Sequence, residues 1–198
     1  NSAGVVWQMD RYNNTTTDLI KNVVYDSSTN RMTFTVGSGQ TGNAIIAVKA
    51  GSTILWSWHI WVVDDNSFLL NPVDNGWSGG IFMDRNLGAF NSSSTSDSYG
   101  LYYQWGRKDP FPRPLDIVRS SATTVDNKEL TANATTSAEV GTVSYTISNP
   151  DTRIFSTNDW HNEWRNNGLW GNSDGLTKNV KTVYDPCPEG YCVPDQNC

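Results

Sequence analysis

This sequence of 198 residues has few charged side chains, which make up 17% of it, and no long apolar run. A membrane-spanning helix needs about 20 consecutive apolar residues, and no run here approaches that length. Lysine and arginine do not cluster, and acidic residues outnumber basic ones by 20 to 14. This balance argues against a nucleic-acid-binding protein. The repeats of coiled coils and of collagen are absent as well.

Aromatic residues, in contrast, are abundant: they make up 12% of the chain and include nine tryptophans. A disordered chain would contain few of them. The length suits one domain or two small ones with a buried core. The formal net charge of −6 and the many Asn, Ser and Thr residues are typical of an extracellular, β-rich protein. Tryptophans on such a surface bind sugars or other proteins.

Cysteine is scarce, and the only three are Cys187, Cys192 and Cys198. Their C-x4-C-x5-C spacing lacks the paired C-x2-C or the nearby histidines of a zinc site. We therefore expect a disulfide between two of the three, and the odd cysteine suggests a partner outside this chain. The start at Asn1, without an initiator methionine or a signal segment, indicates a processed mature form or a fragment.

Alternating apolar residues and polar turns predict a small antiparallel, sandwich-like β module over residues 1–65. Strands are expected at Val23–Tyr25, Arg31–Val36, Asn43–Lys49 and Ile54–Val63. The last of these has largely apolar residues on both faces. This pattern predicts a central strand that is covered on both sides.

Residues 66–198 are richer in turns and are expected to form a loop-rich second domain. Short strands are predicted at Ile81–Met83 and Val143–Ile147. The one candidate helix is Asn158–Arg165, which Asp159 would cap and the following Asn-Asn-Gly would end. The fold class is therefore mainly β, or a β-rich α+β fold.

Four segments, taken in order, carry a family resemblance. They are Ile54–Val63 (ILWSWHIWVV), Met83–Ala89 (MDRNLGA), Gly100–Phe111 (GLYYQWGRKDPF) and Thr182–Pro194 (TVYDPCPEGYCVP). Over roughly residues 40–194, this order resembles the C-terminal region of Bacteroidetes fimbrillin-family surface proteins. That region carries the so-called major paralogous, FISUMP-type domain.

The resemblance implies a secreted, often lipid-anchored cell-surface protein with a C-type-lectin-like domain over residues 66–198. It implies adhesion, fimbrial structure or ligand display without catalysis. The expected partners are a glycan, a host or bacterial surface protein, or further copies of the chain in a filament. Membrane attachment would come only from a lipid anchor outside this chain. The alternative function is a carbohydrate-binding accessory module of a polysaccharide-capture system.

Two departures from the family pattern affect the second domain. The chain has Cys192 where the family usually has arginine, and it ends soon after the Val-Pro pair at 193–194. The family continues there with a helix and further lectin-like strands. We therefore expect the lectin-like domain to be truncated here or to close in another way.

Two patterns resemble catalytic sites but lack the context that catalysis needs. Gly76–Gly80 matches G-x-S-x-G around Ser78, yet a loop precedes it and a strand follows it, whereas a nucleophile elbow lies between a strand and a helix. Asp159 and Glu163 are one of many carboxylate pairs, and nothing singles them out for glycoside hydrolysis. His59 is expected to be a buried imidazole bonded to a neighbour. We therefore expect no catalytic residues.

Oxygen-rich turns at Asp64–Asn66, Asn75 and Asn172–Asp174 offer ligands for calcium. The sequence contains no D-x-D-x-D-G loop with a distal glutamate. We therefore expect no metal and no cofactor, with calcium as the alternative.

A tryptophan-rich segment near the C-terminus is the candidate ligand site. Indole rings stack on sugar rings while amide and guanidinium groups bind the hydroxyls, and the same residues anchor protein interfaces. The alternative is that these tryptophans pack a loop-rich core. The candidate residues are Trp160, Asn162, Trp164, Arg165 and Trp170.

Overall fold

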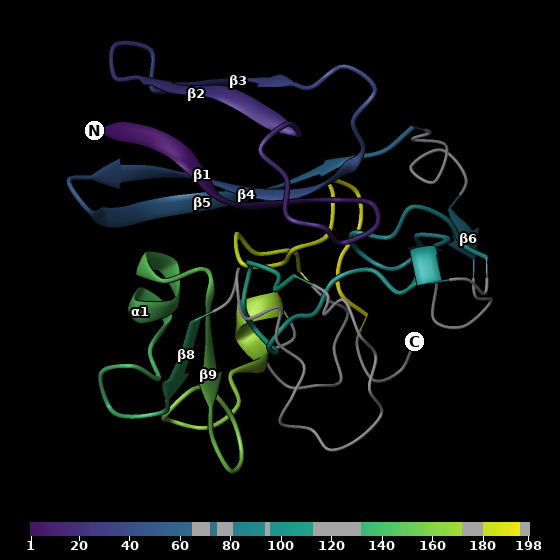
Figure 1. The fold of residues 1–198 in the computed structure, drawn as a ribbon. Coiled ribbons are helices and arrows are strands. Elements are labelled where there is room, and N and C mark those ends of the chain that lie inside the picture. The colour runs from purple at the N-terminus through teal and green to yellow at the C-terminus, as the bar shows by residue number, and fades with distance from the viewer. Residues whose placement is uncertain (65–71, 75–80, 94–95, 113–131, 172–179, 195–198) are drawn as a thin grey trace.

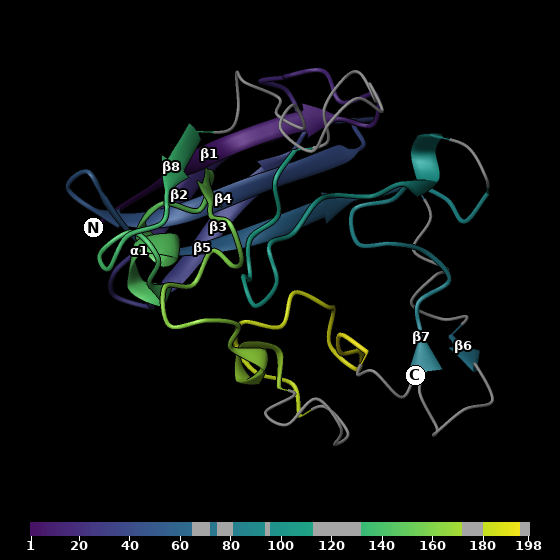
Figure 2. The ribbon, with the colours of Figure 1, turned by 90° about the horizontal axis from the view of Figure 1, so that it is seen from below.

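The computed structural model arranges the chain in three stacked parts (Figure 1). The residues that it describes are 1–64, 72–74, 81–93, 96–112, 132–171 and 180–194. A two-stranded hairpin lies over a three-stranded sheet, and the second half of the chain lies against the opposite face of that sheet (Figures 1 and 2). The mainly β fold that the sequence predicts is confirmed.

The first five strands build the hairpin and the sheet. They are β1 (Ser2–Asp10), β2 (Ile20–Asp26), β3 (Arg31–Val36), β4 (Gly42–Ala50) and β5 (Thr53–Val62). The sheet has the order β1-β4-β5 and is antiparallel, and β2 pairs with β3. All four strands predicted for the β module are confirmed, whereas β1 was not predicted.

The sequence predicts that Ile54–Val63 is a central strand, and the position of β5 corrects this prediction. The central strand of the sheet is β4, and β5 lies at an edge because β1 pairs with the other side of β4. Edge placement leaves Leu55 45% and Trp58 42% exposed. β5 has apolar residues on both faces because the β2–β3 hairpin lies on one face of the sheet and the second half of the chain lies on the other.

Both faces of the sheet carry a core. Side chains alternate along β4, so that Ala44 and Ile46 pack with Leu19 under the hairpin. Ile45 points to the opposite face and packs with Met9. The sheet itself is therefore covered on both sides, and its buried strand is β4, not the strand Ile54–Val63 for which this cover was predicted.

The second half contains short elements joined by long loops. They are β6 (Val73–Asp74), β7 (Ile81–Phe82), η2 (Ser96–Ser98), β8 (Ala132–Thr135), α1 (Val143–Ser148), β9 (Thr152–Phe155) and η3 (Asn167–Trp170). Strands β8 and β9 are parallel, and β6 and β7 lie apart from the other strands (Figure 2). The short strand predicted at Ile81–Met83 is confirmed by β7.

Two local predictions in this half are wrong. Residues 143–148 form helix α1, because the Thr142 hydroxyl caps it by accepting from Tyr145 N at 3.2 Å. Asn158–Arg165 forms turns and no helix. There the Asp159 carboxylate accepts from His161 N at 3.0 Å, which closes a local turn.

The two halves contact each other directly through polar side chains. The Asn43 amide on β4 donates to Gly88 O at 3.0 Å, and both residues are buried. A boundary at residue 65 and a lectin-like second domain stay predictions. No helix among the described residues has the length and apolar character needed to cross a membrane.

Candidate functional site

The site is assembled around the Gly100–Phe111 segment, whose Arg107 fixes the loop between α1 and β9. Arg107 is 2% exposed and donates to main-chain carbonyls between Asn149 and Thr152, the shortest bond being 2.6 Å to Thr152 O. Burial lowers the pKa of Arg107 to about 10. The guanidinium therefore stays charged at neutral pH and serves as a structural anchor.

Lys108 and Asp109 form a buried ion pair beneath β5. The Nζ–Oδ2 distance is 2.7 Å, and the side chains are 8% and 3% exposed. The Ser57 hydroxyl accepts from Lys108 Nζ and donates to Asp109 Oδ1 at 2.9 Å. A serine–lysine pair needs a neutral lysine to act as base. Burial lowers the pKa of Lys108, but the Asp109 carboxylate binds both the ammonium and the serine proton. This triad is suited to joining the halves, not to attacking a substrate.

His59 extends the same polar contact. Its Nε2 lies 2.9 Å from Asn43 Oδ1, and the Asn43 amide nitrogen is used by Gly88 O, so His59 donates through Nε2. Burial lowers the pKa of His59 to about 4, which keeps the imidazole neutral at pH 7. The expected hydrogen bond between the imidazole and a neighbour is confirmed, and His59 is partly buried instead of fully buried.

Asp185 organises the turn at 185–194. Its side chain is 0% exposed and accepts from Cys187 N at 2.8 Å and from Val193 N at 3.0 Å. Lys181 Nζ neutralises the carboxylate at 3.1 Å. The buried Asp185 side chain thus binds both ends of the turn and holds the turn in place as one wall of a cavity.

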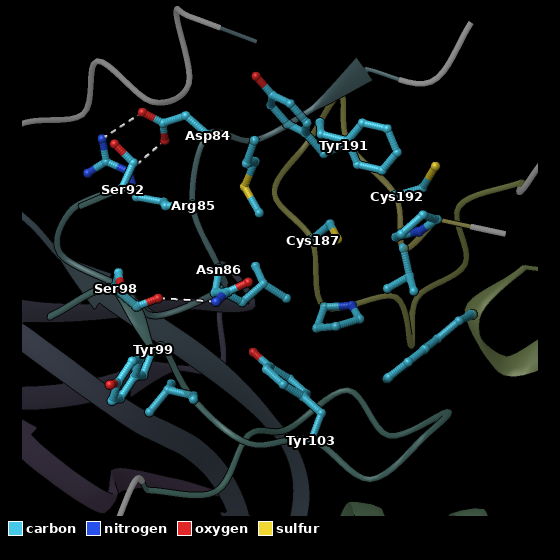
Figure 3. A pocket seen from close by; sticks show the side chains of 18 of the residues that line it. Asp84, Arg85, Asn86, Ser92, Ser98, Tyr99, Tyr103, Cys187, Tyr191 and Cys192 are labelled. Atoms are coloured by element: carbon cyan, nitrogen blue, oxygen red, sulfur yellow. Dashed lines mark hydrogen bonds and ion pairs between the residues drawn. The ribbon is translucent and has the colours of Figure 1, made fainter. Parts of the chain in front are cut away.

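That wall bounds a cavity of about 730 Å³, which we call the aromatic cavity (Figure 3). The volume is in the range of small-molecule sites. Polar side chains, including Asn86 and Ser98, line one side, and the turn with Cys187 lies opposite (Figure 3). Three of the four family-like segments, at 83–89, 100–111 and 182–194, contribute lining residues.

The Tyr103 hydroxyl points toward the middle of the aromatic cavity (Figure 3). It is buried and has no hydrogen-bond partner among the described residues. Burial raises its pKa well above the usual value, so the hydroxyl stays protonated. An unsatisfied buried polar group costs about 1–3 kcal/mol. A ligand oxygen placed against Tyr103 would recover that cost.

The charged pair in the cavity wall is already satisfied. Arg85 Nε lies 2.7 Å from Asp84 Oδ1, Nη2 lies 3.1 Å from Oδ2, and the Arg85 side chain is 7% exposed. Asn86 is exposed, and its amide donates to Ser98 O at 3.1 Å. The cavity therefore offers hydroxyl and amide groups without a net charge.

The predicted ligand residues divide into two environments. Trp160 is 4% and Trp170 is 6% exposed, and their indole N–H groups donate to the carbonyls of Trp105 at 2.6 Å and Arg107 at 3.1 Å. Both indoles are thus core residues, as the alternative interpretation held. Trp170 still contributes part of the cavity wall, where its ring packs 4.7 Å from that of Trp105.

The other three predicted residues lie on an exposed loop. Trp164 is 63% exposed and has a left-handed φ of 79°, which is strained for a large side chain. Asn162 and Arg165 are exposed too, and Arg165 Nε lies 4.0 Å from Asp159 Oδ2. The structure does not bring the five residues into one site. Ligand binding by them stays a prediction.

Sequence reasoning missed Tyr103 and Asn86 as site residues. The available signal was the family-like segments that contain them, but nothing in the sequence brings these segments together. In the folded chain these segments surround the aromatic cavity, because Asp185 fixes the turn at 185–194.

The predicted disulfide is not formed between Cys187 and Cys192, and Cys198 lies outside the described residues. Burial, reinforced by the Asp185 carboxylate, raises the pKa of Cys187 and keeps its thiol protonated. Both cysteines line the aromatic cavity.

The calcium and hydrolase candidates can be placed only in part. Ser78, Asp65, Asn66, Asn75 and Asn172–Asp174 lie outside the described residues. Asp64 is described and lies 3.3 Å from Arg11 Nη1. Among the described residues, no group of three or more His, Cys, Asp or Glu side chains could hold a metal ion.

Comparisons with known proteins give no relative: no family model, curated protein or solved structure matches this chain. The resemblance to fimbrillin-family surface proteins therefore stays a prediction.

Proposed function

We propose that this chain is a noncatalytic recognition protein of the bacterial cell surface that binds a glycan in the aromatic cavity and acts in adhesion. The observation that carries the proposal is the buried Tyr103 hydroxyl, which has no hydrogen-bond partner in the described part of the chain and is directed into a cavity of about 730 Å³. A hydroxyl that both donates and accepts is complementary to the hydroxyls of a sugar. Trp170 and Tyr103 supply aromatic surface for the apolar face of a sugar ring.

The noncatalytic part of the proposal is supported by the described polar groups. In the serine–lysine–aspartate cluster at Ser57, the Asp109 carboxylate accepts hydrogen bonds from both the Ser57 hydroxyl and the Lys108 ammonium. Of the carboxylate pair considered in the sequence, Asp159 is used by a turn and Glu163 is exposed. Neither group is placed as an oriented acid or base facing the cavity.

The surface location is supported by composition. The low charge content, the acidic net charge of −6 and the many Asn, Ser and Thr residues suit an exported protein, and the family-like segments point the same way. A carbohydrate-binding accessory module would use the same cavity. The two roles differ in the source of the glycan, which is a neighbouring cell in adhesion and a nutrient polysaccharide in capture.

The test is a glycan-array screen followed by titration with tryptophan fluorescence, in which Trp170 reports on the cavity. Tyr103→Phe should weaken binding of an array-positive sugar roughly tenfold, as expected for one lost hydrogen bond. Tyr12→Phe, on an exposed side chain of the β module, is the matched control and should bind normally. A wild-type protein that binds no glycan at millimolar concentration would refute the proposal.

A further inference from the structure

A second cleft adjoins the aromatic cavity and shares part of its wall. Three residues, Leu87, Pro186 and Cys187, line both spaces. All three are only partly buried, as expected for a ridge that is open on each side. The second space, which we call the β5 cleft, has a volume of about 530 Å³. Each space has the size of a small-ligand site, and the two share this ridge as part of their walls.

Aromatic side chains line both sides of the ridge. Tyr103 and Trp170 lie in the aromatic cavity, and Trp56 and Trp61 of β5 lie in the β5 cleft. In the cleft, the rings of His59 and Trp61 are nearly parallel, with an interplanar angle of 13° and centroids 6.5 Å apart. Two aromatic surfaces in succession suit a chain of rings better than one isolated ring.

Charge pairing on both sides favours an uncharged ligand. In the aromatic cavity the charged groups are Asp84 and Arg85, which pair at 2.7 Å. In the β5 cleft, Lys108 pairs with Asp109 at 2.7 Å. Asp185 pairs with Lys181 at 3.1 Å, and His59 is neutral at pH 7 because its pKa is lowered to about 4. The net charge of −6 would repel an anionic polymer.

The hydrogen-bonding groups favour a polysaccharide over an extended peptide. A peptide that binds along a sheet edge needs the main-chain groups of that edge. At the middle of β5 the Ser57 carbonyl already accepts from Lys108 Nζ at 2.9 Å. The groups facing the aromatic cavity, such as the Tyr103 hydroxyl and the Asn86 amide, both donate and accept, as sugar hydroxyls require.

From these contacts we infer that the binding site is a two-part groove for an internal stretch of a neutral polysaccharide, with sugar units on both sides of the Leu87–Pro186–Cys187 ridge. The inference rests on the proposed function and adds to it the length and charge class of the ligand. The aromatic cavity holds one unit against Tyr103, and the β5 cleft holds the following units.

The test is isothermal titration with neutral gluco-, manno- and xylo-oligosaccharides of one to six units. For a series that binds, the dissociation constant should fall at least tenfold from one unit to four and then level off. Oligogalacturonate of matched length should bind more weakly. Equal affinity for one and six units, or tighter binding of oligogalacturonate, would overturn the inference while leaving the proposed function intact.

Two matched valine variants separate the two spaces. Val183 is 72% exposed and lines the β5 cleft, whereas Val180 is 75% exposed and does not line the described cavities. Val183→Glu should weaken binding of the four-unit ligand at least tenfold and leave the one-unit ligand unchanged, and Val180→Glu should change neither. If Val183→Glu has no effect on long ligands, the inference is wrong. If no oligosaccharide of any length binds while a neutral aromatic peptide does, the proposed function fails with it.

Discussion

The ammonium of Lys108 lies 2.7 Å from the Asp109 carboxylate beneath β5, and neither side chain is more than 8% exposed. Lys108 also donates to Ser57 O at 2.9 Å and lies 4.5 Å from the centre of the Trp56 ring. A single side chain of the second half thus contacts the edge strand of the first half through a hydrogen bond to the main chain and a cation–π contact. This arrangement explains why the sheet and the loop-rich half form one continuous structure around the candidate site.

Removing the lysine charge should destabilise the fold. Lys108→Met leaves the Asp109 carboxylate buried without its cation, which should lower the free energy of unfolding by about 3–5 kcal/mol. Urea unfolding followed by tryptophan fluorescence measures the change. Lys21→Met, in an exposed pair with Asp18, is the control and should cost less than about 1 kcal/mol. Equal effects of the two variants would show that the buried pair does not join the halves.

Stability should fall in mild acid because of His59. Its pKa is about 4 in the folded chain, below the ordinary value of 6.5, so the unfolded chain binds more protons between these values. The contribution is therefore complete above pH 6.5 and is lost as the pH falls through about 4. It amounts to about 3 kcal/mol at most. His59→Gln should flatten the unfolding free energy between pH 6.5 and 4, measured by urea titration at each pH, and an unchanged slope would contradict this assignment.

The Asp185 carboxylate should control the turn that forms one cavity wall. Asp185→Asn replaces one acceptor oxygen by an amide nitrogen, so the bonds to Cys187 N and Val193 N cannot both be kept. We expect a loss of about 1–3 kcal/mol and faster amide hydrogen exchange at residues 187 and 193. Asp26→Asn, at the exposed end of β2, should leave that exchange unchanged. Retained protection at 193 in the Asp185 variant would contradict the role of this side chain.

Substitutions at Trp160 and Trp164 should affect stability for different reasons. Trp160→Phe removes a buried hydrogen bond and some packing, which should cost about 1–3 kcal/mol. Trp164→Gly relieves the left-handed backbone at φ 79° and should be more stable than Trp164→Ala by roughly 1 kcal/mol. Thermal unfolding of the three variants provides the comparison. A glycine variant no more stable than the alanine variant would argue against backbone strain at Trp164.

The strands of the β module could be predicted from the sequence, because alternation and turn residues are local signals. The position of each strand in the sheet could not be predicted. The apolar residues on both faces of β5 suggested a central strand. They occur in an edge strand because the hairpin packs on one face of the sheet and the second half of the chain packs on the other. Residues 143–148 include β-branched residues typical of a strand, yet the Thr142 cap and tertiary packing make them helical.

The candidate site was harder to predict than the fold. Trp160 and Trp170, two of the five candidate ligand residues in the sequence, are buried in the core. Tyr103 is instead brought to the cavity by contacts among segments that are far apart in the chain, such as Asn43 with Gly88 and Lys108 with Ser57. Single-sequence patterns carry no information on such long-range pairing.

Sugar recognition by the aromatic cavity can be measured by titrating array-positive sugars into wild-type and Tyr103→Phe protein. We expect saturable binding by the wild type, a roughly tenfold larger dissociation constant for Tyr103→Phe, and an unfolding stability that is unchanged or slightly higher. Identical affinities for the two proteins would place the ligand elsewhere and rule out recognition through Tyr103.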